Sequence, residues 1–154
     1  MNIEYINPFI EASQAVLNQF NINAKLGKVY LKTQPHKGDN IMIIVGLTGK
    51  IRGQAVFGMS KPVATYIASN MMGGMPISEL DEMSKSAISE LTNMILGNTA
   101  TILYNKGVGV EITPPSFLMG ENMEIYSDKM QTICIPLQLQ DSKILEIDIS
   151  VEKG

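Results

Sequence analysis

The chain has 154 residues, a net charge of −3, one cysteine and one histidine. Apolar residues make up 45% of it and charged residues 18%, which is typical of a folded protein and excludes a disordered one. The length suits a single domain over 1–154, and the absence of a Lys/Arg cluster disfavours binding to nucleic acid or to an acidic membrane. Neither a membrane span nor a signal peptide is indicated, so we expect a cytoplasmic protein.

The single cysteine and the single histidine leave little room for metal or nucleophilic chemistry. Cys134 lies in an apolar run, which is typical of a core residue whose thiol stays protonated. His36 lies in a predicted loop, without a second histidine to share a metal. We therefore expect no metal site and no cofactor of the chain's own. A Ser-His-Asp or Cys-His mechanism is disfavoured for the same reason.

The first half of the chain predicts one helix followed by three strands. Asn7 is a candidate N-cap and Pro8 suits the first helical position, so we expect a helix from there to about residue 20. Strands are predicted over 28–33, 40–47 and 51–59. The short link 48–50 contains a glycine and indicates a hairpin between the last two strands.

Two further helices and three or four strands follow. A second helix is predicted over 60–72 and ends at Gly73 and Gly74. The third begins at the capping-box spacing of Ser78 and Asp81 and runs to 105, a length of roughly 39 Å. Strands are predicted over 109–113, 123–126, 130–138 and 143–151, with Asp141 and Ser142 in a turn between the last two. A loop with Pro114 and Pro115 follows the first of these strands.

The order of the elements predicts an α+β fold. Hairpin links favour a largely antiparallel (mixed) sheet with three helices on one face. Each half of the chain runs from a helix to three strands, which suggests a pseudo-duplicated architecture.

The long third helix carries a polar seam formed by Ser86, Glu90, Asn93 and Gly97. At 100° per residue these four positions fall within a strip of about 60°. Such a strip is most often a solvated face, but Asn and Gly each cost a helix interior roughly 0.5–1 kcal/mol relative to Ala. The missing side chain at Gly97 would also let another chain approach Asn93 closely.

The same wheel predicts which positions of this helix are buried. Leu96 is predicted on the exposed side, as a candidate contact residue. The predicted solvent side also holds Glu82, Lys85, Ser89 and Thr92. The predicted core stripe holds Leu80, Met83, Ala87, Leu91, Met94 and Ile102.

The seam resembles a family signature. Residues 86–98 are similar to the (Asp/Ser)-x3-Glu-x2-Asn signature of the CheC/CheX/FliY phosphatases of bacterial chemotaxis, with Ser86, Glu90 and Asn93 at its named positions. The family pattern has a proline further along the chain, which Pro115 or its neighbour matches. Segments 7–10 and 71–76 also look like the CheX-like members. The resemblance therefore covers essentially the whole chain and implies a CheC-like fold.

The resemblance implies a function and roles for single residues. Proteins of this family remove the phosphoryl group from the aspartate of phosphorylated CheY, a response regulator that brings its own Mg²⁺ and lysine. Asn93 would orient the attacking water, and Glu90 would pair with the regulator's lysine. These residue types fit because phosphoryl transfer depends mainly on positioning and on charge. The other residues implied in regulator binding or support are Ser86, Leu96, Gly97 and Pro115.

The first helix serves as an internal comparison. Aligning Asn18 with Asn93 places Ala15 opposite Glu90, so a duplicated first helix would keep the Asn and lack the Glu. The chain thus resembles the CheX-like members, which carry one site per subunit. Because CheX-like proteins tend to dimerise through sheet edges, the resemblance also implies a homodimer.

Two other interpretations stay open at this point. In the first, the same helix edge docks a response regulator or a flagellar-switch component without hydrolysing anything. In the second, the chain is a structural or sensing domain in which some of the 11 methionines line an adaptable pocket. The joint presence of Glu90 and Asn93 favours the phosphatase over the first, and the core spacing of most methionines argues against the second.

Overall fold

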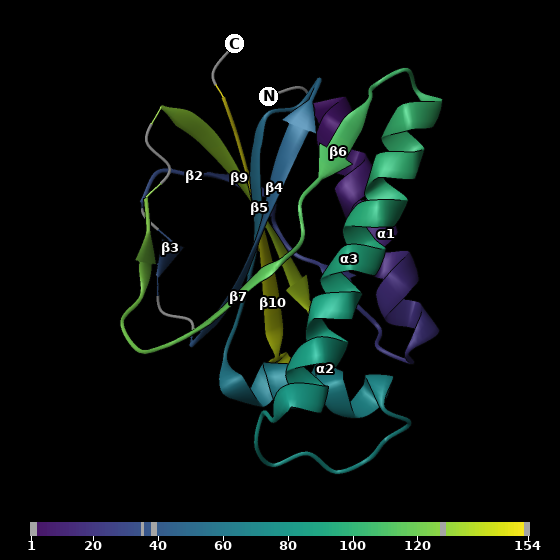
Figure 1. Ribbon diagram of the computed structural model, residues 1–154, viewed down its shortest axis with the longest axis vertical. Helices are drawn as coiled ribbons and strands as arrows, with labels where there is room; N and C mark the ends of the chain where they lie inside the picture. The colour runs from purple at the N-terminus through teal and green to yellow at the C-terminus, as the bar shows by residue number, and fades with distance from the viewer. Residues whose placement is uncertain (1–2, 35, 38–39, 127–128, 153–154) are drawn as a thin grey trace.

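In the computed structural model, an antiparallel sheet packs against helices on one face. The structure describes residues 3–34, 36–37, 40–126 and 129–152. Helices α1 (Ile3–Gln19) and α3 (Glu82–Asn105) cover the sheet, and α2 (Lys61–Met71) crosses its lower end against α3 (Figure 1). The predicted α+β fold is confirmed. No helix in the described part has the length and apolar character to cross a membrane.

The sheet has the strand order β1-β9-β10-β5-β4-β6, and every pairing in it is antiparallel. Two short strands lie off this path, because β2 also pairs with β9 and β7 also pairs with β4. The strands of this sheet are β1 (Lys25–Leu26), β2 (Tyr30–Lys32), β4 (Ile41–Gly49), β5 (Gly53–Met59), β6 (Val110–Ile112), β7 (Ser116–Met119), β9 (Met130–Gln138) and β10 (Ile144–Glu152).

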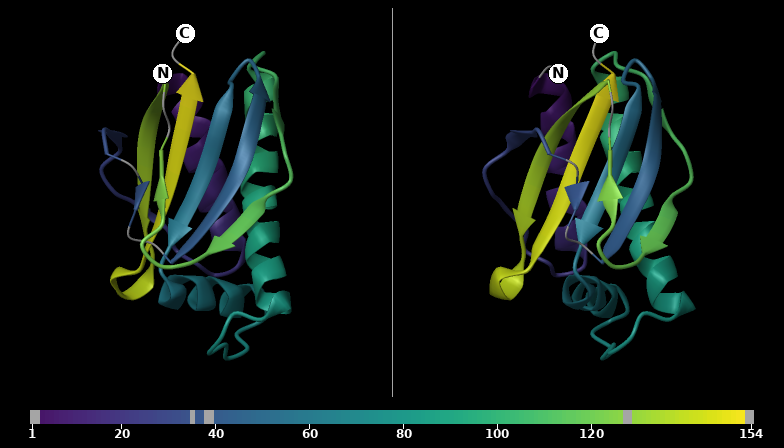
Figure 2. Two further views of the ribbon diagram at one scale, coloured as in Figure 1. Left: turned by 60° about the vertical axis from the view of Figure 1, so that its left-hand side comes forward. Right: turned by 90° about the vertical axis from the view of Figure 1, so that its left-hand side faces the viewer.

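The face of the sheet away from the helices is partly covered by chain rather than by a helix layer. A separate two-stranded ribbon, β3 (His36–Lys37) with β8 (Glu124–Ile125), crosses in front of it (Figure 2). The prediction of a loop at His36 is therefore wrong, because the backbone of His36 pairs with that of Ile125.

Alternation along the long strands separates the two faces of the sheet. In β10, the positions that join the main core are Leu145, Ile147, Ile149 and Val151, whereas Glu146, Asp148 and Ser150 lie between them. Since successive side chains of a strand point to opposite faces, these three polar residues lie on the face without helices.

Two turns form as the sequence predicts. The link between β4 and β5 closes a hairpin in which Gly49 has φ +104°, and a Cβ there would lie 2.5 Å from the Gly109 carbonyl oxygen. Only glycine fits such a position. Between β9 and β10, Asp141 and Ser142 have φ values of 56° and 62°, in the left-handed region where short polar residues are most tolerated.

The predicted start of the first helix is wrong. The helix begins at Ile3, so Pro8 lies inside it and Asn7 is not its cap. Pro8 removes one backbone hydrogen bond of that turn. The additional turn buries Ile6, which is 1% exposed, and this burial in the core offsets the loss.

Three further boundaries differ from expectation. The cap of α3 is Asp81 rather than Ser78, because the Asp81 carboxylate accepts a hydrogen bond from the Ser84 amide at 2.8 Å. The predicted strand 28–33 is shortened to β2, and the separate strand β1 lies before it, where none was predicted; the two pair with different stretches of β9. The loop predicted after Pro115 contains β7, an edge strand that exists through its pairing with β4. Such long-range pairing leaves little local signal.

Candidate functional site

The polar seam of α3 faces solvent along the outer side of the helix layer. Ser86 and Glu90 are exposed, and Asn93 and Gly97 are half-buried. On the wheel, the seam lies opposite the residues that α3 buries: Ser84, Ile88, Leu91, Thr92, Ile95, Leu96, Thr99 and Leu103. The structure therefore brings the four seam residues together on one accessible strip.

The predicted core stripe of α3 is rotated from the observed one, although Leu91 is buried as predicted and the seam is where it was expected. Met83 is 66% exposed, whereas Thr92, predicted on the wet side, is 1% exposed. The buried hydroxyls explain the error, because Thr92 donates to the Ser89 carbonyl at 2.7 Å and Thr99 donates to the Ile95 carbonyl at 2.8 Å. A hydroxyl bonded to its own helix is buried at little cost, so hydropathy does not report such positions.

Leu96 is not a contact residue. It is 1% exposed and belongs to the main hydrophobic core. The predicted stripe was rotated away from the real one, and this rotation put Leu96 on the wrong side. Its role is to hold α3 against the rest of the fold.

The two polar groups at the centre of the seam are available to a partner. Among the described residues, neither the Glu90 carboxylate nor the Asn93 carboxamide makes a hydrogen bond or an ion pair. They are three residues apart on a helix, so their Cβ atoms are separated by about 5–6 Å. Because the helix packs on α1 and α2, this spacing is held rigidly.

Gly97 lies on this strip, whereas Pro115 lies beside it. A Cβ added to Gly97 would have no heavy atom of the described residues within 4 Å, so none of these neighbours requires glycine there. Pro115 is half-buried between β6 and β7, at the sheet edge. Since β6 packs against α3, Pro115 belongs to a segment beside the helix and not to the seam itself.

The first helix shows the arrangement expected of a degenerate copy. Its positions Glu11, Ala15 and Asn18 are all exposed, and α1 packs directly against α3 on the same face of the sheet. At the position aligned with Glu90 it carries Ala15, so α1 presents an asparagine without a neighbouring carboxylate at that spacing.

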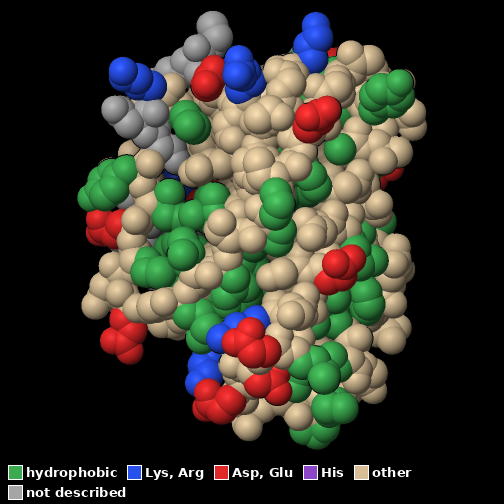
Figure 3. Space-filling model, in the orientation of Figure 1, with side chains coloured by type: hydrophobic (Ala, Val, Ile, Leu, Met, Phe, Trp, Pro, Cys, Tyr) green, Lys and Arg blue, Asp and Glu red, His purple; other side chains and the backbone are tan. Residues whose placement is uncertain are grey.

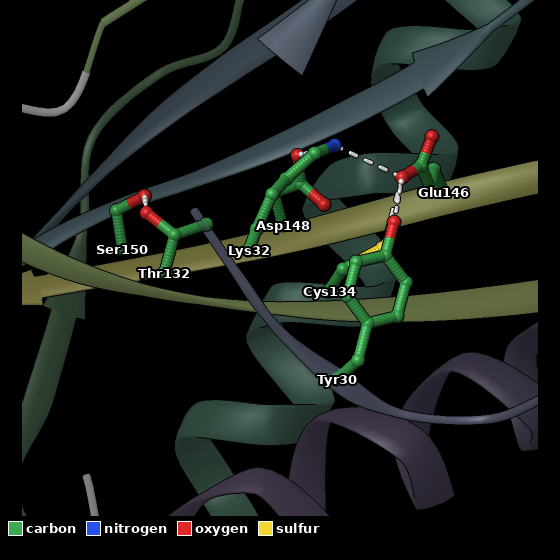
Figure 4. A network of polar contacts seen from close by, with 7 residues as sticks. All are labelled: Tyr30, Lys32, Thr132, Cys134, Glu146, Asp148 and Ser150. Atoms are coloured by element: carbon green, nitrogen blue, oxygen red, sulfur yellow. Dashed lines mark hydrogen bonds and ion pairs between the residues drawn. The ribbon is translucent and has the colours of Figure 1, made fainter. Parts of the chain in front are cut away.

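A second polar group, which sequence reasoning missed, lies on the face of the sheet without helices. This ion-pair cluster consists of Tyr30, Lys32, Cys134, Glu146 and Asp148 (Figure 4). The Lys32 ammonium lies 3.0 Å from a Glu146 oxygen and 2.8 Å from an Asp148 oxygen. The Cys134 thiol and the Tyr30 hydroxyl donate to the same Glu146 oxygen, at 2.9 and 3.3 Å.

The environment of the ion-pair cluster shifts several pKa values. Burial lowers the pKa of Lys32, but its hydrogen bonds and charge interactions with Asp148 and Glu146 outweigh burial and leave it raised. Burial and the hydrogen bond to Glu146 raise the pKa of the Cys134 thiol well above its usual range. The hydrogen bond with Cys134, followed by burial, raises the pKa of Tyr30 in the same way.

The ion-pair cluster contains three side chains of types that bind metals. Ligand atoms of Cys134, Glu146 and Asp148 all lie within 4.8 Å of one another. The Lys32 ammonium is already bound to both carboxylates, and the thiol is held protonated, whereas a metal requires the thiolate. The arrangement is that of an internal ion pair in which lysine supplies the cation.

Comparison with known proteins agrees with the architecture and with the sequence signature. The family model for the chemotaxis phosphatase CheX matches residues 41–138. The chain is 30% identical over 155 residues to the CheY-P phosphatase CheX of Thermotoga maritima, covering 100% of this chain and 99% of that protein.

Solved structures show the same fold over the full length. The CheX-CheY-BeF3-Mg²⁺ complex from Borrelia burgdorferi matches with 33% identity and a TM-score of 0.82, covering 99% of this chain and 100% of that chain. A CheC-like superfamily protein from Shewanella sp. PV-4 matches with 28% identity and a TM-score of 0.88, again covering 99% and 100%. With the family model spanning most of the chain and a relative matching throughout, this protein belongs to the CheX family of chemotaxis phosphatases.

Proposed function

We propose that this protein is a phosphatase of phosphorylated CheY-type response regulators and that it acts through Asn93 and Glu90. The regulator carries the phosphoryl group on an aspartate, together with its own Mg²⁺ and lysine. In the reaction, a water oxygen forms a bond to phosphorus while the bond between phosphorus and the aspartyl oxygen breaks. The products are inorganic phosphate and the free aspartate of the regulator.

The observation that carries the proposal is the pairing of an accessible carboxamide and an accessible carboxylate on a rigid helix, neither bonded within the described part of the chain. An amide both accepts from and donates to water without titrating, so Asn93 is suited to orient the attacking water. Orientation is the main requirement, because phosphoryl transfer depends on positioning and charge rather than on a strong base.

Glu90 is suited to hold the regulator in register. Its carboxylate is exposed and would form a charge-assisted hydrogen bond with the regulator's lysine ammonium. Because Glu90 lies one helical turn from Asn93, this bond would place Asn93 beside the phosphoryl group. Ser86 and Gly97 continue the same strip and would contact the regulator on either side, with Pro115 on the neighbouring segment.

Two relatives of this chain support the assignment. The Thermotoga relative is named a CheY-P phosphatase, and the Borrelia relative was crystallised with CheY, BeF3 and Mg²⁺. A binding module that docks the regulator without hydrolysis remains the second candidate, favoured only by the existence of that stable complex.

Phosphate release from a CheY protein of the same organism, kept phosphorylated by a small-molecule donor with Mg²⁺, tests the proposal. We expect the wild type to accelerate release and Asn93→Ala to lower the rate at least about 100-fold. Glu90→Gln should weaken regulator binding about tenfold, because it removes a charge-assisted hydrogen bond. Equal activity of Asn93→Ala and wild type would refute the role of Asn93.

Matched controls lie away from the seam. Asn98 is exposed on α3 but lies off the seam, and Glu152 is exposed at the end of β10, in the sheet. Asn98→Ala and Glu152→Gln should therefore leave phosphate release within twofold of wild type. Binding of the regulator with no acceleration by the wild type would favour the binding module instead.

The homodimer stays a prediction. The short strands β2 and β7, which pair with β9 and β4, carry exposed apolar residues. These are Tyr30 and Leu31 in β2 and Leu118 and Met119 in β7. Exposed sheet edges of this kind favour association of chains. Light scattering should give twice the chain mass, and a monomer at working concentration would remove the prediction.

A further inference from the structure

An exposed apolar side chain lies in line with the polar seam, at the N-terminal end of α3. Met83 is 66% exposed and precedes Glu90 by seven residues, so it lies two helical turns away on the same strip. A single exposed apolar residue is ordinary on a protein surface. Its position relative to the Glu90–Asn93 site therefore decides whether it has a role.

Tyr104 provides the comparison, because it is also exposed, at 74%, and lies in line with the seam at the other end of α3. At 1.5 Å per residue, Met83 is about 13 Å from the midpoint of Glu90 and Asn93, and Tyr104 is about 19 Å from it. A standard interface buries about 800 Å² on each partner, which corresponds to a disc of about 16 Å radius. A regulator centred on the site would cover Met83 and would not reach Tyr104.

The segment before α3 adds a second apolar side chain at the same end of the molecule. Met75 is 55% exposed, and its carbonyl accepts a hydrogen bond from the Ser69 hydroxyl of α2 at 2.7 Å. Gly73 and Gly74, with φ of 73° and 88°, make the turn that leads into it. Figure 3 shows hydrophobic side chains gathered at the lower end of this face, where α3 begins.

We propose that Met83, supported by Met75, is an apolar anchor for the phosphorylated response regulator and sets the affinity of its docking. The inference rests on the proposed function, because the occupant is the regulator whose phosphoryl group meets Asn93. Continuity with the site supports this occupant: from Met83 through Glu90 and Asn93 to the open space at Gly97, one accessible strip extends about 21 Å along the helix. Methionine suits such a contact because its flexible side chain adapts to the partner's surface.

The anchor is far from the reacting atoms, so it stabilises the docked regulator before and during hydrolysis alike. Uniform binding of this kind lowers KM without changing kcat. This separates an anchor from Asn93, whose removal acts on kcat, and from a structural residue, whose removal acts on folding.

Two measurements on the full chain test the anchor. The first is the Kd for CheY in its BeF3–Mg²⁺ form, which needs no turnover. The second is kcat and KM for phosphate release from phosphorylated CheY. The variants are Met83→Ala, Met83→Leu, Tyr104→Ala and Asn93→Ala, with circular dichroism confirming that each is folded.

We expect Met83→Ala to raise both Kd and KM about tenfold with kcat within twofold, which is the effect of losing a buried side chain of this size. Met83→Leu should restore both constants, and Tyr104→Ala should change neither. Wild-type constants in Met83→Ala would overturn the anchor, and an equal loss in Tyr104→Ala would overturn its placement at this end of α3.

Failure of the proposed function gives a different pattern. It would appear as no acceleration by the wild type, or as full activity in Asn93→Ala, whatever the behaviour of Met83. Loss of turnover in Asn93→Ala together with wild-type constants in Met83→Ala would leave the phosphatase standing and remove only the anchor.

Discussion

The polar seam of α3 and the ion-pair cluster on the other face of the sheet differ in where their hydrogen-bonding groups find partners. Glu90 and Asn93 face solvent without a bonding partner in the described part of the chain, on a helix that needs neither for its own packing. Lys32, Glu146 and Asp148 are largely withdrawn from water and hold one another. The seam offers its hydrogen-bonding capacity to a partner, whereas the cluster uses its capacity inside the fold.

The same difference explains where the shifted pKa values of this molecule lie. Strongly shifted pKa values often mark functional sites. Here the largest shifts belong to Tyr30 and Cys134, in the cluster that ties β2 and β9 to β10, and they follow from burial and hydrogen bonding. The proposed chemistry needs no shifted base, because an amide positions the water.

The largest effect on stability should come from removing the cation of the cluster. Lys32→Met would leave two carboxylates together, one of them 2% exposed, without a compensating charge. We expect the free energy of unfolding to fall by about 3–5 kcal/mol. Lys61→Met, which removes an exposed ion pair with Glu79, should cost less than about 1 kcal/mol. Urea titration of both variants measures the difference, and equal losses would contradict the comparison.

Leu96 tests the boundary between seam and core. Leu96→Ala should lower the free energy of unfolding by about 2–5 kcal/mol, because it opens a cavity in the core. The folded variant should keep its KM for the phosphorylated regulator, because the side chain does not reach the surface. A raised KM without loss of stability would return Leu96 to the contact surface.

Alkaline pH should weaken the fold through the cluster. Folded-state pKa values of Cys134, Tyr30 and Lys32 are all raised, so their contribution is complete below the unfolded values and is lost as pH rises. Because the pKa of the unfolded thiol is about 8.5, the free energy of unfolding should begin to fall at that pH and should fall more steeply above about pH 10. Cys134→Ser, which does not titrate in this range, should remove the first part of the decline in denaturant titrations from pH 7 to 11.

The smallest expected effect on stability is a gain rather than a loss. Gly97→Ala adds a methyl group into open space on a helix and should raise the free energy of unfolding by about 0.5–1 kcal/mol. The same methyl group should impede the regulator and raise KM. A more stable variant with an unchanged KM would show that the regulator does not use this space.

Locally encoded features were the ones predicted correctly. The relative placement of Ser86, Glu90, Asn93 and Gly97 depends only on helical geometry, so it needs no tertiary contact. The glycines after α2, the hairpin at Gly49 and the turn at Asp141 were also predicted, because their conformations are short-range. The boundary at Pro8 failed because burial of Ile6 outweighs a local helix-start signal.

The sequence by itself determined the helices, the long strands, most turns, the strip that carries Glu90 and Asn93, and the family signature. Only the tertiary structure decided which side of α3 is buried, because Thr92 and Thr99 bury hydroxyls that hydropathy assigns to water. It alone also joined Lys32 to Asp148, 116 residues further along, since pairing across strands leaves no trace in local spacing. Local geometry follows from neighbouring residues, but burial and charge pairing depend on what the fold brings into contact.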